Sequence, residues 1–326
     1  MMKKVRYAVI GCGEHALRGH VVPGNEVPAL ELVGVFDPDD AKMRAVRDAR
    51  TVQTDFTCYK SETALLEDAD VDAIMIASPD RHHMSSLVAA IGEGKHVLCD
   101  KPLVVDPLDL HSLDQMLGRA EKRKLVVTSC HPRRFDPPYL WLKKNLDSTK
   151  ATFGDVQSLE LDFSYHKPSK TGLHAGLLAD HFNHEFDLTH FLFGHAPAIV
   201  HRLHDGDMRY VAVGMRDDGI GFSFHGTRLL EGQHYREFAR IRFASGQVDL
   251  DCSTGLAVIH DHETGRKREI RPGRTDYAVR FRAVMANFVG AVLGKTPNYL
   301  TRQDLRANAE SCVRLTLSSH YLYRPL

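Results

Sequence analysis

The sequence predicts an α/β fold in two domains: a doubly wound parallel sheet, then an α+β domain with a large, open, mostly antiparallel sheet. The length of 326 residues exceeds the roughly 100 to 200 residues of one ordinary domain. Up to about residue 130, short apolar runs alternate with helical periodicities, which is typical of a parallel sheet with crossover helices. Beyond it, apolar and polar residues alternate within the runs, as in antiparallel strands with one exposed face.

The first domain is predicted to span residues 1–129. Its expected helices cover residues 41–49 and 85–94, and Gly92 and Gly94 mark the end of the second. Its expected strands are the β-rich apolar runs at 5–10, 31–37, 72–77, 96–99 and 125–129.

The second domain is predicted to span residues 130–326, and its expected helices cover 177–193, 277–293 and 301–321. The last is an amphipathic closing helix, which can pack back onto the first domain. The expected strands are the alternating runs at 156–164, 208–215, 236–243, 247–252 and 256–260.

The amino-acid composition limits which binding partners and which cell compartment are expected. Lys plus Arg and Asp plus Glu are both 42, so the net charge is zero, and no overall field attracts nucleic acid or an anionic membrane. The N-terminal stretch is not expected to act as a secretory segment, and the sequence contains no run of the roughly 18 apolar residues that a membrane span needs. The cysteines form no CxxC pair, which favours reduced thiols in the cytoplasm over zinc or disulfides; they are Cys12, Cys58, Cys99, Cys130, Cys252 and Cys312.

A glycine-rich turn follows the first predicted strand. Gly11, Gly13 and Ala16 occupy the positions of a G-x-G-x-x-G/A motif. The first glycine permits the tight turn, and the second lets the backbone approach a pyrophosphate that the next helix binds at its N-terminus. Glu14 and His15 lie in the first turn of that helix, so we include them in the predicted cofactor site.

An acidic residue ends the second predicted strand. Asp37 lies 21 residues after Ala16, where a carboxylate accepts a hydrogen bond from the adenosine ribose 2′-OH of a bound dinucleotide. The next residues are Pro38, Asp39 and Asp40, and no adjacent arginine is present to hold a 2′-phosphate. The first domain is therefore predicted to be a Rossmann domain that binds NAD in preference to NADP.

Four further motifs resemble those of one protein family. They are SPDRHH at 78–83, DKP at 100–102, HPRRFD at 131–136 and DHFNHEFD at 180–187. Together with the glycine turn, and in this order over nearly the whole chain, they resemble the Gfo/Idh/MocA oxidoreductases, the family of glucose-fructose oxidoreductase and inositol dehydrogenase.

The resemblance implies roles for the residues after two strands of the first domain. Ser78, Pro79 and His83 would lie along the cofactor. Asp100, which replaces the family's usual glutamate, would bond the nicotinamide ribose, and Lys101 would reach both nicotinamide and substrate. Lys101 also follows a predicted parallel strand, and ligands of such folds bind at that edge of the sheet. A solvated surface lysine is the alternative.

Asp180, His184 and Asp187 match the family pattern D-x-G-x-H-x-x-D, with Phe182 in place of glycine. Residues four apart on a helix share a face, and an imidazole suits a general base near neutral pH. We therefore expect His184 to move the hydroxyl proton and Asp180 to orient the substrate. A merely solvated helix face is the alternative.

A metal site is not expected on this helix. His181, His184 and Glu185 form the order HxxHE, which fits neither H-E-x-x-H nor H-x-x-E-H.

The resemblance thus implies an NAD-dependent oxidoreductase that transfers a hydride between nicotinamide and a carbinol or keto carbon of a sugar, a cyclitol or a derivative. Two alternatives stay open: a regulatory protein that senses NAD or sugar, and a sugar oxidoreductase that keeps its cofactor bound through the cycle. The resemblance also implies a homodimer or homotetramer formed through the outer face of the second sheet.

Overall fold

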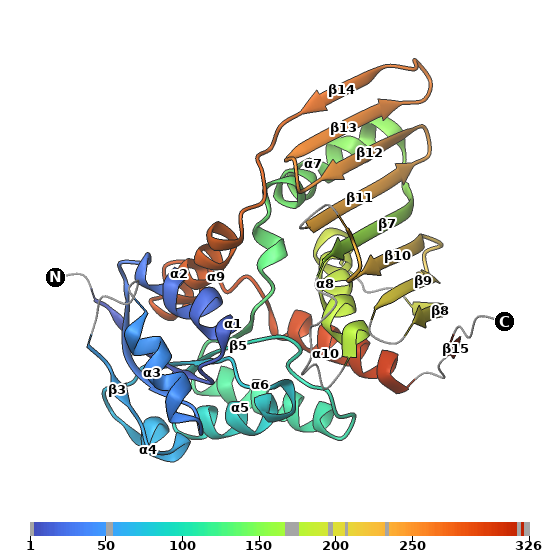
Figure 1. The fold of residues 1–326 in the computed structure, drawn as a ribbon. Coiled ribbons are helices and arrows are strands. Elements are labelled where there is room, and N and C mark those ends of the chain that lie inside the picture. Colours follow the sequence, from blue (N-terminus) through green and yellow to red (C-terminus); the bar gives the residue numbers. More distant parts are fainter. Residues whose placement is uncertain are drawn as a thin grey trace. The chain divides into compact units, whose positions relative to one another are not determined.

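The computed structural model describes residues 3–49, 55–166, 176–194, 198–205, 208–231, 235–317 and 321–322 (Figure 1). The chain divides into two compact units. Unit 1 runs to Pro132 and includes Tyr277–Val313, and unit 2 comprises Arg133–Asp276 and the residues from Arg314 on. This division differs from the predicted one, because residues 277–313, assigned by sequence to the second domain, pack in unit 1.

The sheet of unit 1 is wholly parallel, with the order β3-β2-β1-β4-β5-β6. The predicted doubly wound fold is confirmed. The sequence did not predict the two-residue β3, which is too short to show a period. The strands are β1 Val5–Ile10, β2 Leu30–Phe36, β3 Thr57–Cys58, β4 Ala73–Ile76, β5 His96–Cys99 and β6 Val127–Ser129.

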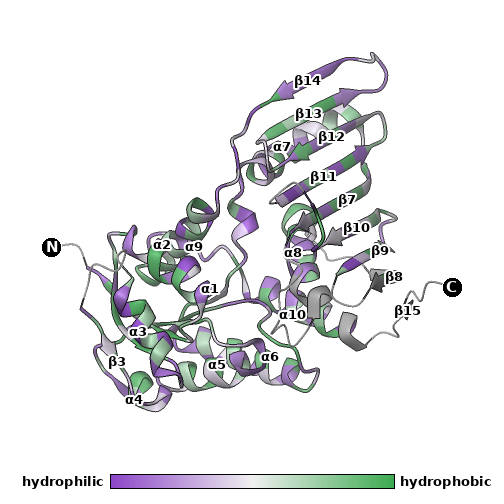
Figure 2. Cartoon of the chain, in the orientation of Figure 1, coloured by the Kyte–Doolittle hydropathy of each residue, from purple (hydrophilic) through white to green (hydrophobic). Residues whose placement is uncertain are grey.

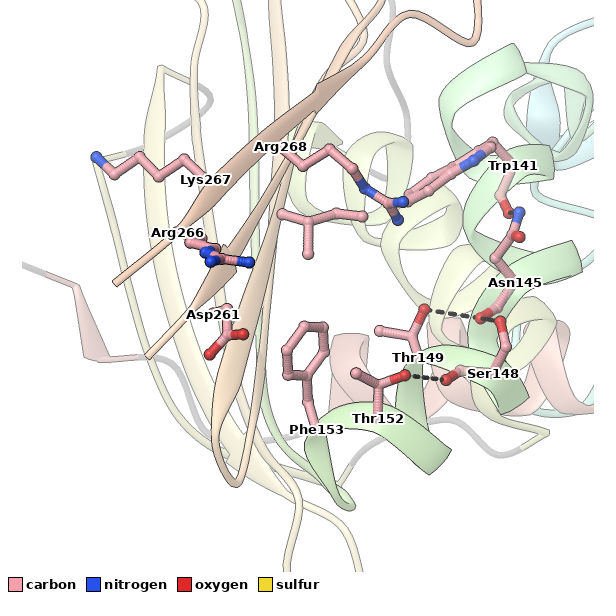
Figure 3. Close-up of a pocket in the computed structure, with 11 residues that line it drawn as sticks. Trp141, Asn145, Ser148, Thr149, Thr152, Phe153, Asp261, Arg266, Lys267 and Arg268 are labelled. Atoms are coloured by element: carbon pink, nitrogen blue, oxygen red, sulfur yellow. Dashed lines mark hydrogen bonds between the residues drawn. The ribbon is translucent and has the colours of Figure 1, made fainter. Parts of the chain in front are cut away.

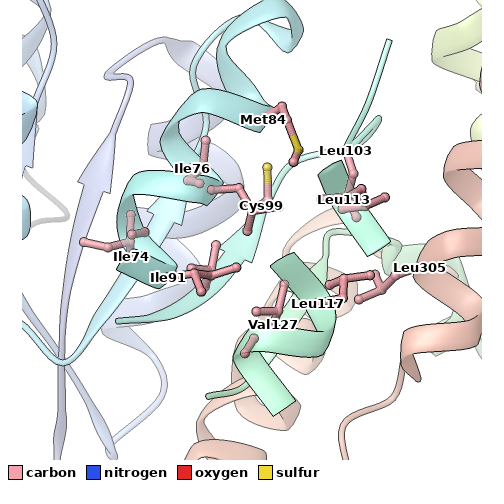
Figure 4. Close-up of a cluster of buried hydrophobic side chains, with 14 of the residues drawn as sticks. Ile74, Ile76, Met84, Ile91, Cys99, Leu103, Leu113, Leu117, Val127 and Leu305 are labelled. Atoms are coloured by element: carbon pink, nitrogen blue, oxygen red, sulfur yellow. The ribbon is translucent and has the colours of Figure 1, made fainter. Parts of the chain in front are cut away.

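One face of this sheet carries a hydrophobic core (Figure 4). Alternate strand residues such as Ile74 and Ile76 meet Ile91 and Leu117 from the helices. Leu305 joins the same cluster, so the closing helix does pack on the first unit. The helices are α5 His83–Gly92, α6 Asp109–Lys122 and α10 Arg302–Leu317. Burying a side chain of this kind contributes about 1.5 to 3 kcal/mol, which holds α10 to unit 1 although the chain has first traversed unit 2.

The opposite face is covered by α9 (Tyr277–Val292) and by the helical segment after the glycine turn. That segment consists of α1 Glu14–Ala16, the π-helical turn η1 Leu17–Val21 and α2 Val22–Asn25. Gly24 leaves room for the Tyr7 ring of β1, with Met285 of α9 close by. The remaining helices of this unit are α3 Asp40–Asp48, α4 Glu62–Glu67 and η2 Asp80–His82.

Unit 2 is built on one large sheet, which has nine strands among the described residues, in the order β14-β13-β12-β11-β7-β10-β9-β8-β15. The β10–β7 and β15–β8 pairs are parallel and the others are antiparallel, which confirms the mostly antiparallel sheet. Figure 2 shows hydrophobic and hydrophilic residues mixed along β11, β12 and β13. The strands are β7 Val156–Tyr165, β8 Ala198–Asp205, β9 Arg209–Met215, β10 Gly221–Thr227, β11 Tyr235–Phe243, β12 Gly246–Asp251, β13 Leu256–Asp261, β14 Lys267–Ile270 and β15 Tyr321–Leu322.

Several of these elements were not predicted. The glycines of β10 and the charged residues of β14 hide their strand pattern. The predicted closing helix is too long at its end, because Tyr321, its last predicted residue, lies in β15 and pairs with β8.

Within the described part of unit 2, helices α7 Pro137–Phe153 and α8 Gly176–Phe193 pack together, and the short turn η3 Pro132–Phe135 precedes them. Helix α7 begins with two prolines, which suit the first helical turn, and ends at Gly154, whose φ of 83° terminates the helix. The sequence predicted α8 but not α7. No helix among the described residues is long and apolar enough to cross a membrane.

Candidate active site

The two motif glycines have different roles. Gly11 has a φ of 92°, and a Cβ there would lie 2.5 Å from the Ser78 nitrogen and 2.6 Å from the Ala77 carbonyl carbon. Only glycine fits, because the turn presses against the end of β4. A Cβ at Gly13 would meet no heavy atom of the described chain within 4 Å. The backbone at Gly13 is therefore open to a cofactor phosphate, as the motif predicts.

Asp37 lies at the end of β2, beside the glycine turn. Its Oδ2 accepts a hydrogen bond from the Cys12 N–H at 2.8 Å, and its Oδ1 accepts one from the Asp39 N–H at 2.9 Å. The side chain is buried, and the Lys42 ammonium lies 3.9 Å from Oδ1. These contacts fix the carboxylate against the turn, at the place where the motif expects a ribose acceptor.

The segment after β4 contains one unsatisfied donor and one bridging imidazole. The buried Ser78 hydroxyl has no hydrogen-bond partner within the described part of the chain, which fits a group that an incoming ligand oxygen satisfies. His83 is buried and contacts the carbonyl oxygens of Pro102 at 2.7 Å and Ser78 at 2.8 Å. His83 therefore holds the loops after β4 and β5 together, whereas Pro79 is exposed beside the turn.

Asp100, directly after β5, is held by two histidines. Its Oδ1 lies 2.8 Å from His20 Nε2, and its Oδ2 lies 3.3 Å from His15 Nε2. His20 is fully buried, and the Tyr277 hydroxyl contacts the other ring nitrogen of His15 at 3.2 Å. Burial opposes ionisation of Asp100, but the two histidines outweigh it and hold the pKa of this carboxyl well below its usual value.

Sequence reasoning missed His20. In a regular α-helix, side chains five residues apart point about 140° away from one another. The π-helical turn η1 follows an i to i+5 hydrogen-bond pattern, and it brings His15 and His20 to the same carboxylate. These three residues are also the one set among the described residues with metal-ligand chemistry, with ligand atoms within 4.8 Å of one another. The distances from the Asp100 oxygens to the two imidazole nitrogens are those of hydrogen bonds, so we interpret the three side chains as a hydrogen-bonded cluster.

Lys101 follows Asp100 and is half-buried; its peptide bond to Pro102 is cis. The glycine turn, Asp37, Ser78 and Lys101 follow β1, β2, β4 and β5 in turn. The strand order reverses between β1 and β4, and ligands of open α/β sheets bind outside the carboxyl ends of the strands at that point. Unit 1 thus brings its predicted site residues to one edge of its sheet.

In unit 2, His184 is half-buried on α8. Asp180 belongs to the same helix, but its side chain lies outside the described residues. Asp187 is buried and forms a two-pronged ion pair with Arg134, with distances of 2.7 to 3.0 Å. Asp187 therefore anchors the helix. The opposition of His184 and Asp180 to Lys101 stays a prediction.

Phe182, which stands where the family pattern has glycine, is fully buried. Its ring packs against the rings of Phe186, Tyr210 and Phe224, at centroid distances of 5.9, 4.7 and 6.0 Å. Phe182 is therefore part of the aromatic core between α8 and the sheet.

A pocket of about 600 Å³ lies elsewhere in unit 2, between α7 and the β13–β14 hairpin (Figure 3). The hydroxyl groups of Ser148, Thr149 and Thr152 donate to carbonyl oxygens of their own helix. None of the predicted site residues lines this pocket, and its hydroxyl donors are already used.

The comparison with protein families agrees with this geometry. The family model GFO_IDH_MocA, described as an oxidoreductase family with an NAD-binding Rossmann fold, matches residues 5–131. Residues 5–131, which form most of unit 1, therefore match the NAD-binding Rossmann domain of an oxidoreductase family. This match and the inositol 2-dehydrogenase relatives confirm the Gfo/Idh/MocA resemblance found in the motifs.

Among curated relatives, an inositol 2-dehydrogenase from Saccharopolyspora erythraea is 32% identical over 151 residues. The match covers 46% of this chain and 43% of the relative. The chain spans about half the length of the curated relatives that it matches.

Solved structures match over nearly the whole chain. A UDP-N-acetylglucosamine 3-dehydrogenase from Acidithiobacillus ferrooxidans is 24% identical, with a TM-score of 0.79, and the match covers 97% of this chain and 98% of that one. A 3-ketoreductase from Actinomadura kijaniata, solved with NADP, is 18% identical, with a TM-score of 0.78, and the match covers 99% and 100%. At these identities the likeness establishes the two-part fold.

Proposed function

We propose that this protein is an NAD-dependent oxidoreductase that transfers a hydride between nicotinamide and a carbinol or keto carbon of a sugar, cyclitol or related polyhydroxylated compound. The observation that carries the proposal is the convergence of Gly13, Asp37, Ser78 and Lys101 at one edge of the parallel sheet. Relatives that are named for inositol and for a nucleotide sugar support the substrate class.

The residues present fit a dinucleotide. The open backbone at Gly13 and the unsatisfied Ser78 hydroxyl suit its phosphates, and Asp37 suits its adenosine ribose. When bound, the nicotinamide supplies the hydride acceptor for oxidation and the hydride donor for reduction. The fixed Asp37 carboxylate repels a 2′-phosphate, which favours NAD over NADP.

The protein's own groups supply the proton chemistry. The Lys101 ammonium donates a hydrogen bond to the substrate oxygen and stabilises its alkoxide character as the hydride leaves. The His184 imidazole accepts the hydroxyl proton during oxidation and returns it during reduction, while Asp180 orients the hydroxyl. The chain of Asp100, His15 and His20 fixes the backbone that carries Lys101.

A test of the function is NADH formation from NAD with a panel of cyclitols, sugars, sugar phosphates and nucleotide sugars, with NADP assayed in parallel. We expect turnover with at least one polyol, a higher kcat/KM with NAD than with NADP, and loss of most turnover in His184→Ala with cofactor binding retained. Calorimetry measures that binding. Wild-type rates in His184→Ala would refute the role of His184 as proton acceptor. Failure of the wild-type protein to bind either cofactor would refute the proposed function.

We also propose that the protein acts in the cytoplasm, which the scattered cysteine spacing supports, and that it forms a homodimer or homotetramer. The proposed interface is the outer face of β8 and β9, where apolar side chains are exposed: Leu203, Val211, Val213 and Met215. Leu203 and Val211 are paired across the two strands, so the exposed groups form one continuous surface.

Sedimentation at micromolar concentration tests this assembly. We expect a mass of two or four chains, and dissociation in Val213→Glu because the added charge would be buried in the interface. Leu140→Glu, an exposed position on α7, is the matched control and should leave the mass unchanged. A monomeric wild-type protein would contradict the proposal.

A further inference from the structure

We propose that Tyr165, His181, Tyr210 and Glu185 form a proton relay, which carries the proton that His184 accepts during substrate oxidation onward from the half-buried Tyr165 to the fully buried Glu185. The inference rests on the proposed oxidoreductase function. It adds an internal proton acceptor to that function.

The four side chains form a continuous chain of hydrogen-bonding groups within unit 2. The Tyr165 hydroxyl lies 3.2 Å from His181 Nε2, and the Tyr210 hydroxyl lies 3.2 Å from His181 Nδ1. The Tyr210 hydroxyl donates to Glu185 Oε1 at 2.6 Å. Each hydrogen bond joins two groups that can exchange a proton. The His181 imidazole can accept a proton on one side and release one on the other, because each of its nitrogens faces a different hydroxyl.

The surrounding packing holds this chain in place. His181 and Glu185 are four residues apart on α8, so they project from one face of the helix. Tyr210 comes from β9, and its ring occupies the space where a side chain at Gly226 of β10 would lie. Tyr165 ends β7 beside the exposed His166, so the chain runs from the protein's edge into its core.

The direction of each hydrogen bond follows from the last one. Since the Tyr210 O–H donates to Glu185, the Tyr210 oxygen accepts from His181 Nδ1–H, and His181 Nε2 then accepts from the Tyr165 O–H. A proton that reaches the Tyr165 oxygen therefore displaces one proton along each bond. The end state has neutral tyrosines, His181 protonated on Nε2 and a protonated Glu185 carboxyl. After product release the proton returns along the same bonds to Tyr165 and leaves to solvent beside the exposed His166, which restores ionised Glu185 and the starting His181 tautomer. Reduction of a keto substrate runs the inward steps in reverse.

Glu185 is suited to hold that proton. It is fully buried, and its second oxygen, Oε2, has no hydrogen-bond partner among the described residues. Burial raises the pKa of Glu185 to about 8, against the opposing effects of the Tyr210 hydrogen bond and of Arg133; Asp162 and Glu237 raise it further. Arg133, whose charge lowers the pKa of Glu185, itself lies 3.5 Å from the Glu237 carboxylate.

This arrangement makes the two directions of the reaction depend on pH in opposite ways. In oxidation an ionised Glu185 takes up, through the relay, the proton that His184 has first accepted, so kcat rises as pH increases through about 8. Reduction needs the protonated form, so its kcat falls over the same range.

The test compares wild-type protein with Glu185→Gln, which keeps the shape of the side chain and removes its ionisation. We expect the variant to lose the rise in oxidation kcat near pH 8, with a drop on the order of 10-fold at high pH, and to keep its KM and its cofactor affinity. Tyr210→Phe should behave alike, because it breaks the chain at one oxygen. The matched control is Tyr139→Phe, because Tyr139 is a buried tyrosine of α7 that does not belong to the proposed relay.

Infrared difference spectra between acidic and alkaline pH provide a second readout that needs no turnover. A protonated-carboxyl band that disappears near pH 8 and is absent from Glu185→Gln supports the relay. A folded Glu185→Gln protein with the wild-type pH profile, or a wild-type spectrum without such a band, overturns it. Absence of turnover with every polyol, combined with a titrating band, would refute the oxidoreductase function and leave the buried acceptor intact.

Discussion

Replacing Lys101 with alanine is expected to lower the kcat of substrate oxidation by on the order of 10²- to 10³-fold while leaving the NAD dissociation constant within a few-fold of wild type. The lysine follows β5 at the sheet edge where the cofactor-binding residues gather. Its positive charge stabilises the substrate oxygen most strongly in the transition state, when that oxygen gains alkoxide character. Losing such an interaction lowers kcat and kcat/KM together, so steady-state rates and calorimetry measure the two effects separately.

Two further variants sharpen this prediction. Lys101→Met keeps the length and apolar stem of the side chain, so it should lose as much activity as the alanine variant if the charge is responsible. Lys122→Ala removes an exposed lysine from the last turn of α6 and should retain full activity. Oxidation by Lys101→Met at more than half the wild-type rate would show that the ammonium has no catalytic role.

The second large effect is expected at Gly11. Gly11→Ala should destabilise the protein by about 3 kcal/mol, because the new Cβ would lie 2.5 Å from backbone atoms of Ser78 at a positive φ. For a unit of this size, that loss corresponds to a fall of roughly 10 °C in Tm. Thermal unfolding measured in the absence of cofactor tests the effect on the fold alone.

Gly13→Ala is the matched comparison. A Cβ at this position meets no described atom within 4 Å, so the apo protein should melt within about 1 °C of wild type. The same methyl group occupies the space that a pyrophosphate needs, so we expect NAD affinity to fall at least 10-fold. Equal loss of Tm in both variants would contradict the division of roles between the two glycines.

The sequence predicted much of the fold because its local patterns agree with the final structure. Five strands of unit 1 and helices α3, α5, α8 and α9 were found within a few residues of their observed bounds. Those elements have strong apolar periodicity or clear helix ends. Strand β10 was missed because Gly226 leaves room for the Tyr210 ring, a tertiary requirement that weakens the strand pattern.

In the candidate site, too, some residues were predictable from local sequence and others were not. Gly11, Gly13 and Asp37 were found from sequence, because a dinucleotide motif is a local pattern of fixed spacing. Asp187 was grouped with Asp180 and His184 by the family pattern, but the structure pairs it with Arg134, which is remote in sequence. No spacing rule connects such partners.

The cofactor-binding turn, the alternation of strands and helices, and the family resemblance follow from local sequence alone, since each depends on residues close together in the chain. Only the tertiary structure decided that α9 and α10 return to unit 1, because their apolar faces match a core that lies far earlier in the chain. It also decided that a π-helical turn aligns His20 with Asp100, and that Glu185 is buried beside Tyr210. Burial and through-space pairing set these properties, and both arise only when distant segments pack together.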